Sequence, residues 1–157
     1  MTEKNNIKTS SPDFLCVVTS GTLSFKSSHL DEIKLIREGI KAEGVLELAK
    51  SLNWSIDYTA KALGTTSRTL RFFKNKPLNQ KLSENAIEIA RLSSFGIEYF
   101  NSIEAWGEWL NRPSFHFNAL PPYCFLQSIR GRYLIKYIIQ KLRFAGQDHE
   151  FYLDINL

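Results

Sequence analysis

Residues that mark many functional classes are scarce in this chain of 157 amino acids. Its two cysteines, Cys16 and Cys124, lie far apart among apolar neighbours, so we expect two buried, inert thiols rather than a disulfide. Its three histidines, His29, His116 and His149, have no cysteine, histidine or carboxylate at the spacing of metal ligands. The sequence therefore predicts no metal site and no cofactor.

Long hydrophobic runs are also missing, because no apolar stretch approaches the roughly 20 residues that a membrane-spanning helix needs. The N-terminal residues are polar and lead into no apolar segment of a signal peptide, so we expect a cytoplasmic protein. No nucleophile elbow, phosphate-binding loop or dinucleotide fingerprint occurs. A carboxylate pair at helical spacing, Glu84 and Glu88, is followed by Arg91 on the same face, which is typical of a solvated helix. We therefore predict that the protein is not an enzyme and has no catalytic residues.

Residues 55–74 are the most informative segment, because they read as a helix, a tight turn and a second helix. Ala60 falls where two helices must cross closely, and Gly64 ends the first helix in a conformation that disfavours a β-carbon. Thr66 then caps a second helix that begins at Ser67. This pattern is typical of a helix-turn-helix, whose second helix reads the major groove of DNA.

The net charge of +4 is concentrated on this motif and its exit. Residues 1–54 contain seven basic and seven acidic residues, and residues 78–157 contain eight of each. Residues 55–77 contain five basic residues and a single acidic one, Asp57. A chance bias on a solvated face is one interpretation, but the coincidence with the motif favours contact with DNA phosphates.

The second helix of the motif supplies most of the candidate DNA-binding residues. Leu70 and Phe73 are expected to face the core, which leaves Arg68 and Arg71 on the outer face, where either suits a guanine. Hydroxyls and free backbone N–H groups at the helix start suit phosphate, as do lysines at the helix exit. The predicted DNA-binding residues are Thr66, Ser67, Arg68, Thr69, Arg71, Lys74 and Lys76.

The rest of the chain predicts an all-α fold. Besides the motif, helices are expected over 31–38, 42–52, 83–100, 103–110 and 129–144, with Ser83 capping the long one. The expected divisions are an arm (1–30), a DNA-binding domain (31–80) and a helical domain (81–157).

Residues 1–30 differ from the remainder in composition, since they are rich in serine, threonine, asparagine and lysine. Two β-like stretches, 14–18 and 22–25, flank a short polar turn. A small hairpin, an arm used in dimerisation and a disordered tail are all consistent with this pattern. We favour a poorly structured, mostly mobile arm.

A series of short motifs follows the order of a known family. They are residues 35–40, 63–70 (LGTTSRTL), 78–92, 109–113 (WLNRP), 120–126, 128–131 and 143–146. Together they resemble the Xre/MbcA/ParS antitoxins of bacterial type II toxin–antitoxin systems. The resemblance implies a homodimer whose N-terminal half binds the promoter of its own operon. Its C-terminal half would neutralise a toxin from the same operon, either a RES-type enzyme that degrades NAD or an ADP-ribosyltransferase.

Two further functions stay open. The first is a stand-alone helix-turn-helix repressor with a C-terminal dimerisation or effector domain. The second is a protein-interaction module whose helix-turn-helix no longer binds DNA. A fall of DNA affinity with rising salt would favour the antitoxin or the repressor over the interaction module, because phosphate contacts release counterions.

Two regions are candidates for binding the toxin. The tail after residue 146 is acidic and aromatic, which suits the basic pyrophosphate site of an NAD-binding toxin; a frayed terminus is the alternative. The outward stripe of the last helix, which includes Gln140, is the second region, and a solvated face is its alternative. The predicted toxin-binding residues are Arg132, Lys136, Arg143, Asp148, Glu150, Phe151, Tyr152 and Asp154.

Overall fold

The computed structural model describes residues 12–145, and within this range the chain is helical, with isolated bridges but no strand. The predicted all-α fold is confirmed. The elements are α1 (Phe14–Val18), α2 (His29–Glu38), α3 (Ala42–Ser51), α4 (Ile56–Leu63), α5 (Ser67–Phe72), α6 (Gln80–Phe100), α7 (Ile103–Asn111), the 3₁₀ helices η1 (Phe115–Phe117) and η2 (Pro122–Phe125), and α8 (Ile129–Ala145). None of these helices is long and apolar enough to cross a membrane.

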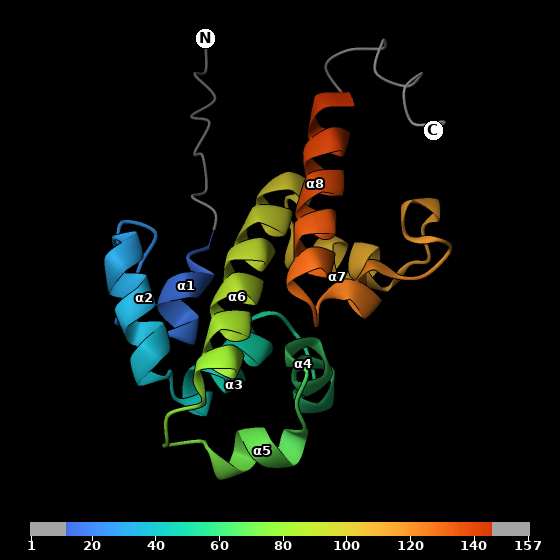
Figure 1. The fold of residues 1–157 in the computed structure, drawn as a ribbon. Helices are drawn as coiled ribbons and strands as arrows, with labels where there is room; N and C mark the ends of the chain where they lie inside the picture. The colour runs from blue at the N-terminus through green and yellow to red at the C-terminus, as the bar shows by residue number, and fades with distance from the viewer. Residues whose placement is uncertain (1–11, 146–157) are drawn as a thin grey trace, which may run out of the picture.

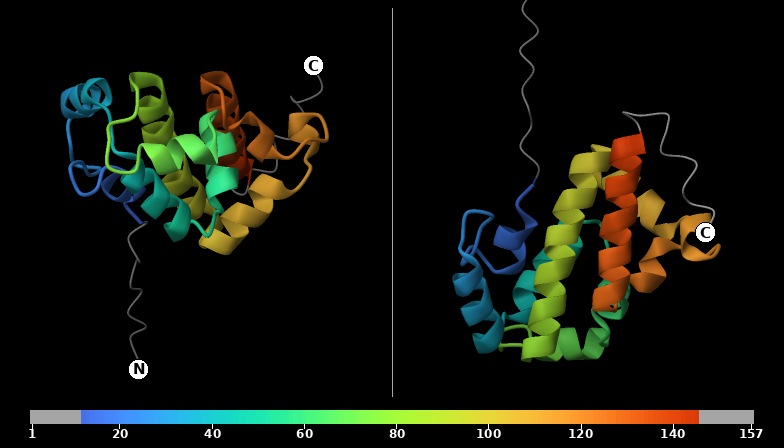
Figure 2. Two further views of the ribbon diagram at one scale, coloured as in Figure 1. Left: turned by 90° about the horizontal axis from the view of Figure 1, so that it is seen from below. Right: turned by 45° about the horizontal axis from the view of Figure 1, so that its top comes forward.

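The long helix α6 is the centre of the fold (Figure 1). It contacts α1, α2, α4, α7 and α8, and the views agree that α8 lies along its side (Figures 1 and 2). A helix that is apolar on two sides is normally covered on two sides, and neighbouring helices cover α6 in this way. One cluster of buried apolar side chains therefore extends from Phe14 in α1 to Ile139 in α8.

Local sequence determines where most helices begin. The hydroxyls of Ser55, Thr66 and Ser102 each accept a hydrogen bond from the backbone N–H three residues later, at 3.0–3.2 Å. The predicted N-cap Thr66 is confirmed. The three hydroxyls satisfy donors that the first turn of a helix leaves without an intrahelical partner.

The predicted cap of the long helix is wrong. α6 begins at Gln80, and the side chain of Asn79 accepts from the Leu82 N–H at 2.8 Å. Ser83 is instead fully buried, and its hydroxyl accepts from the Ile40 N–H at 3.1 Å. Serine and asparagine are both good caps, so the choice between them depended on this contact with a residue far away in the sequence.

Residues 12–30 are folded, which corrects the predicted arm over its described part; residues 1–11 lie outside the described residues. The stretch expected to be β-like is the helix α1. Phe14, Leu15 and Val18 fall on one helical face and are at most 3% exposed. The β propensity of this stretch is overridden because burying that face against α3 and α6 requires a helix.

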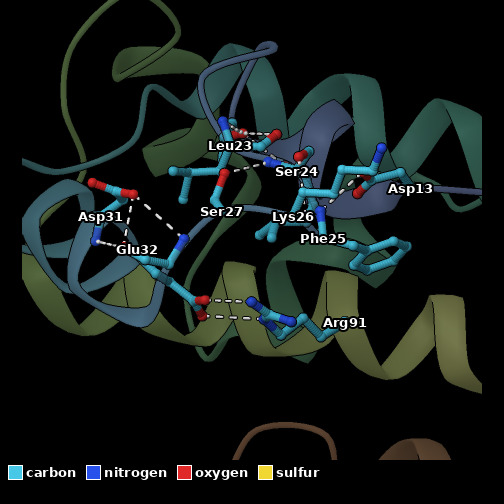
Figure 3. Close-up of polar contacts among 12 residues, drawn as sticks. Asp13, Leu23, Ser24, Phe25, Lys26, Ser27, Asp31, Glu32 and Arg91 are labelled. Atoms are coloured by element: carbon cyan, nitrogen blue, oxygen red, sulfur yellow. Dashed lines mark hydrogen bonds and ion pairs between the residues drawn. The ribbon is translucent and has the colours of Figure 1, made fainter.

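Polar contacts (Figure 3) and one close approach, between α1 and α3, hold this segment in place. The carboxylate of Asp13 caps α1 and also accepts from the Phe25 N–H at 3.1 Å. An ion pair joins Glu32 in α2 to Arg91 in α6. A β-carbon at Gly44 in α3 would lie 2.0 Å from the carbonyl oxygen of Val18, so α1 packs where only glycine fits.

The expectation that both thiols are buried is wrong for Cys124, which is exposed, while Cys16 is partly buried. Cys124 lies in η2, and a 3₁₀ helix repeats every three residues. Tyr123 and Leu126 therefore share the inward side, where Leu126 is fully buried. The apolar neighbours that suggested a buried thiol are the residues that this turn directs inward.

Candidate nucleic-acid interface

The two helices of the predicted motif, α4 and α5, are joined by Gly64, Thr65 and Thr66. Gly64 has the left-handed conformation (φ 78°), and its position after Leu63 ends α4 as predicted. A β-carbon there would meet no atom within 4 Å, so the requirement for glycine is conformational rather than steric. α5 is thereby turned out to the end of the molecule opposite the C-terminal end of α8 (Figure 1).

Basic side chains occupy the outer face of α5. Leu70 is fully buried and Phe73 is partly buried, as predicted. Arg68 and Arg71 are exposed on the opposite side. Phe72, which is 64% exposed, lies beside them.

The hydroxyl groups at the start of α5 are already engaged with each other. Thr66 Oγ1 lies 3.0 Å from Thr69 Oγ1 and also accepts from the Thr69 N–H. Ser67 is only partly exposed. Of the seven predicted DNA-binding residues, the four with basic side chains are therefore the better placed to meet a polyanion.

The exit from α5 is fastened to the start of α3. The carbonyl groups of Phe73 and Lys74 accept from the N–H groups of Ala42 and Glu43 at 3.3 and 2.9 Å. These N–H groups belong to the first turn of α3, where they lack intrahelical partners. Lys74 and Lys76 are both exposed on this fixed segment.

Two charged residues of this surface, Lys41 and Glu43, were not predicted from the sequence. Lys41 is exposed and pairs with Pro77 in an isolated antiparallel bridge, which places it at the exit from α5. Glu43 is also exposed and adds one acid beside Lys74. Neither lies near residues 55–77 in the sequence, so no local signal identified them.

The basic side chains of this surface are not neutralised within the described part of the chain. Within residues 12–145, the ion pairs Glu32–Arg91 and Glu88–Arg132 join α6 to α2 and to α8, and neither involves α5. Arg68, Arg71, Lys74 and Lys76 have no carboxylate partner within these residues. The surface thus has an excess of positive charge directed towards solvent.

A buried polar network supports α4 from behind. The Asn85 side chain in α6 donates to the carbonyl oxygen of Leu63, the last residue of α4, at 3.1 Å. The Arg132 guanidinium donates to Asn85 Oδ1 at 2.9 Å, to the Leu126 carbonyl at 2.8 Å and to Glu88 at 2.5 Å. Arg132 is 5% exposed, so its predicted place on an exposed toxin-binding stripe is corrected. A buried guanidinium needs such partners, and these residues supply them.

A second contact joins α4 to the C-terminal helices. The Tyr58 hydroxyl donates to Asn111 at 3.1 Å, and the Tyr123 hydroxyl donates to the Tyr58 carbonyl at 2.9 Å. The two tyrosine rings stack with their centroids 3.9 Å apart. Burial raises the pKa of both phenols above the usual value for tyrosine, because the phenolate would lose hydration.

The other predicted toxin-binding residues have different surroundings. Lys136 and Gln140 are exposed on α8. Arg143 is half-buried, with its guanidinium 4.8 Å from the centroid of the Phe95 ring. The five tail residues, Asp148, Glu150, Phe151, Tyr152 and Asp154, lie outside the described residues.

No protein-family model matches the chain, and a comparison with curated proteins finds no match either. No group of three or more histidine, cysteine, aspartate or glutamate side chains that could hold a metal ion occurs within residues 12–145. The surfaces of the protein and the motifs in its sequence therefore remain as the indications of its function.

Proposed function

We propose that the protein is a non-enzymatic antitoxin with two binding surfaces. The first surface binds the promoter DNA of its own operon and consists of α5 and the segment that follows it. The second surface, in the C-terminal half, binds and neutralises an NAD-targeting toxin encoded in the same operon. A homodimer is part of the proposal, because helix-turn-helix proteins commonly bind two half-sites as symmetric dimers.

The observation that carries the DNA-binding part is a set of basic side chains on one outward face that have no carboxylate partner within residues 12–145. Arg68 and Arg71 project from α5, and Lys74 and Lys76 follow on a segment that is hydrogen-bonded to α3. Lysine and arginine groups held on a rigid support suit DNA phosphates, and arginine also suits the edge of guanine. The charge and the helix–turn–helix order occur in the same short segment.

The test of this part is binding to a labelled duplex from the region upstream of the gene at several salt concentrations. We expect affinity to fall steeply with salt, and the double variant Arg68→Ala/Arg71→Ala to lose at least about tenfold at low salt. Arg112→Ala is the matched control, because it removes an exposed arginine outside α4 and α5. Affinity that is independent of salt, or equal in the double variant and the control, would refute DNA binding by α5.

The toxin-binding part is supported by the motifs of the sequence and by the outer face of α8. Besides the buried Arg132, this helix contains four basic residues and no acidic one. Ile129, Tyr133, Tyr137 and Phe144 are 43–72% exposed along it. Exposed aromatic groups next to basic groups are typical of protein–protein interfaces, and this face suits a partner with acidic and apolar groups.

Co-expression with the product of the neighbouring open reading frame tests this part. We expect that product to be toxic alone and harmless in a stable complex with this chain. Arg68→Ala/Arg71→Ala should still form the complex, whereas Tyr133→Glu on α8 should weaken it. A harmless neighbour, or one that does not bind, would favour a stand-alone repressor.

A further inference from the structure

Phe72 is an apolar side chain on an otherwise basic face, and the proposed contacts of arginine and lysine with DNA do not involve it. Successive residues of a helix are about 100° apart, so the buried side of α5 is centred between Leu70 and Phe73. The side of α5 opposite to this buried side is centred close to Arg68. Arg71 and Phe72 flank that centre at similar angles around the helix axis. Phe72 thus belongs to the same outward face as the two arginines.

The ring of Phe72 is held in place although it is 64% exposed. The ring of Phe73 meets it in a T-shaped arrangement with centroids 5.0 Å apart. The Lys76 ammonium lies 4.5 Å from the ring centroid. Phe73 and Lys76 therefore restrict the ring of Phe72. The Lys76 ammonium is also a cation that could bind a phosphate while the ring contacts an apolar group.

We propose that Phe72 is a specificity-determining residue that selects a thymine through its 5-methyl group. The inference rests on the proposed DNA-binding function and adds a base preference to it. A phenyl ring has no donor or acceptor for phosphate or for the polar edge of a base. The thymine methyl is the apolar group that bases present in the major groove, and phenylalanine is one of the side chains that contact it. Placing the ring against a polar base edge would instead remove water from that edge without replacing its hydrogen bonds.

The experiment uses duplexes that the wild-type protein selects from a randomised library. In the best selected duplex each thymine is replaced, one at a time, by deoxyuridine, which lacks the methyl group and keeps the pairing edge. We expect at least one replacement to weaken wild-type binding about fourfold, which corresponds to roughly 0.8 kcal/mol for one buried methyl-sized group. The variant Phe72→Ala should bind the thymine duplex several-fold more weakly and should show no penalty for uracil at that position.

Two variants make the result specific. Phe115→Ala removes another exposed phenylalanine, 82% exposed and far from α5 in the sequence, and should keep both the affinity and the uracil penalty. Arg68→Ala should lose affinity but keep the uracil penalty, because it leaves the ring in place. Equal thermal unfolding of the variants would show that folding is not the cause.

The outcomes separate this inference from the function on which it depends. If wild-type binding is salt-dependent but no thymine shows a methyl penalty, or if Phe72→Ala keeps the penalty, the inference is wrong and DNA binding stands. If the wild-type protein selects no duplex and binds DNA without salt dependence, the proposed function and the inference both fail.

Discussion

Replacing Arg132 by methionine should destabilise the protein by about 2–5 kcal/mol. This is more than we expect from the same replacement at any exposed position of α8. The guanidinium donates to the Leu126 carbonyl and to Asn85 Oδ1, and both contacts are buried. Leaving a buried acceptor without its donor costs about 1–3 kcal/mol, and two acceptors are affected. Glu88 is 37% exposed, so water can replace its lost partner and its contribution is small. Methionine recovers part of the packing of the arginine stem.

Urea unfolding followed by tryptophan fluorescence and by circular dichroism measures this effect. Lys136→Met is the matched control, because it makes a similar change at an exposed position of the same helix, and it should cost about 0.5 kcal/mol or less. The double variant Arg132→Met/Asn85→Leu should cost less than the two single variants together, since both remove one shared bond. A cost below about 1 kcal/mol for Arg132→Met, or strict additivity in the double variant, would contradict the buried network.

Three further predictions concern α1, the turn and pH. Gly44→Ala should cost about 3 kcal/mol or displace α1, because its β-carbon would lie 2.0 Å from the Val18 carbonyl oxygen; thermal unfolding measures this. Gly64→Ala should cost only about 1–2 kcal/mol in the same assay, since the strain there is conformational, and a larger loss than for Gly44→Ala would reverse our assignment of the two glycines. Stability should decline as pH rises above about 10, because unfolded Tyr58 then loses a proton that the folded protein, with its raised pKa, retains. Urea midpoints of Tyr58→Phe should therefore fall less between pH 9 and 11 than those of the wild type.

Several parts of the candidate interface could be predicted because they depend on residues close together in the sequence. Gly64 ends α4 and Thr66 caps α5 through bonds that reach only three to five residues along the chain. Leu70 and Phe73 face inward because their spacing matches the helical repeat. The basic residues of the outer face follow from the same repeat, since the positions that are not buried must be exposed.

Other features were decided by contacts between residues that are distant in the sequence. Arg132 occupies a charged position in an amphipathic pattern, yet it is buried because Asn85 and Glu88, on another helix, satisfy it. The periodicity of a sequence predicts which side of a helix is buried. It does not predict which other helix packs against that side.

By itself the sequence determined the all-α class, the turn at Gly64 and the concentration of positive charge on residues 55–77. These properties arise from backbone preferences, short-range hydrogen bonds and composition, which act along the chain. Only the tertiary structure decided that a β-like stretch is the buried helix α1, that Ser83 is not a cap and that Lys41 pairs with Pro77. Each of these results depends on which surfaces meet, because the free energy of burial and of long-range hydrogen bonds exceeds local preferences of about 1 kcal/mol.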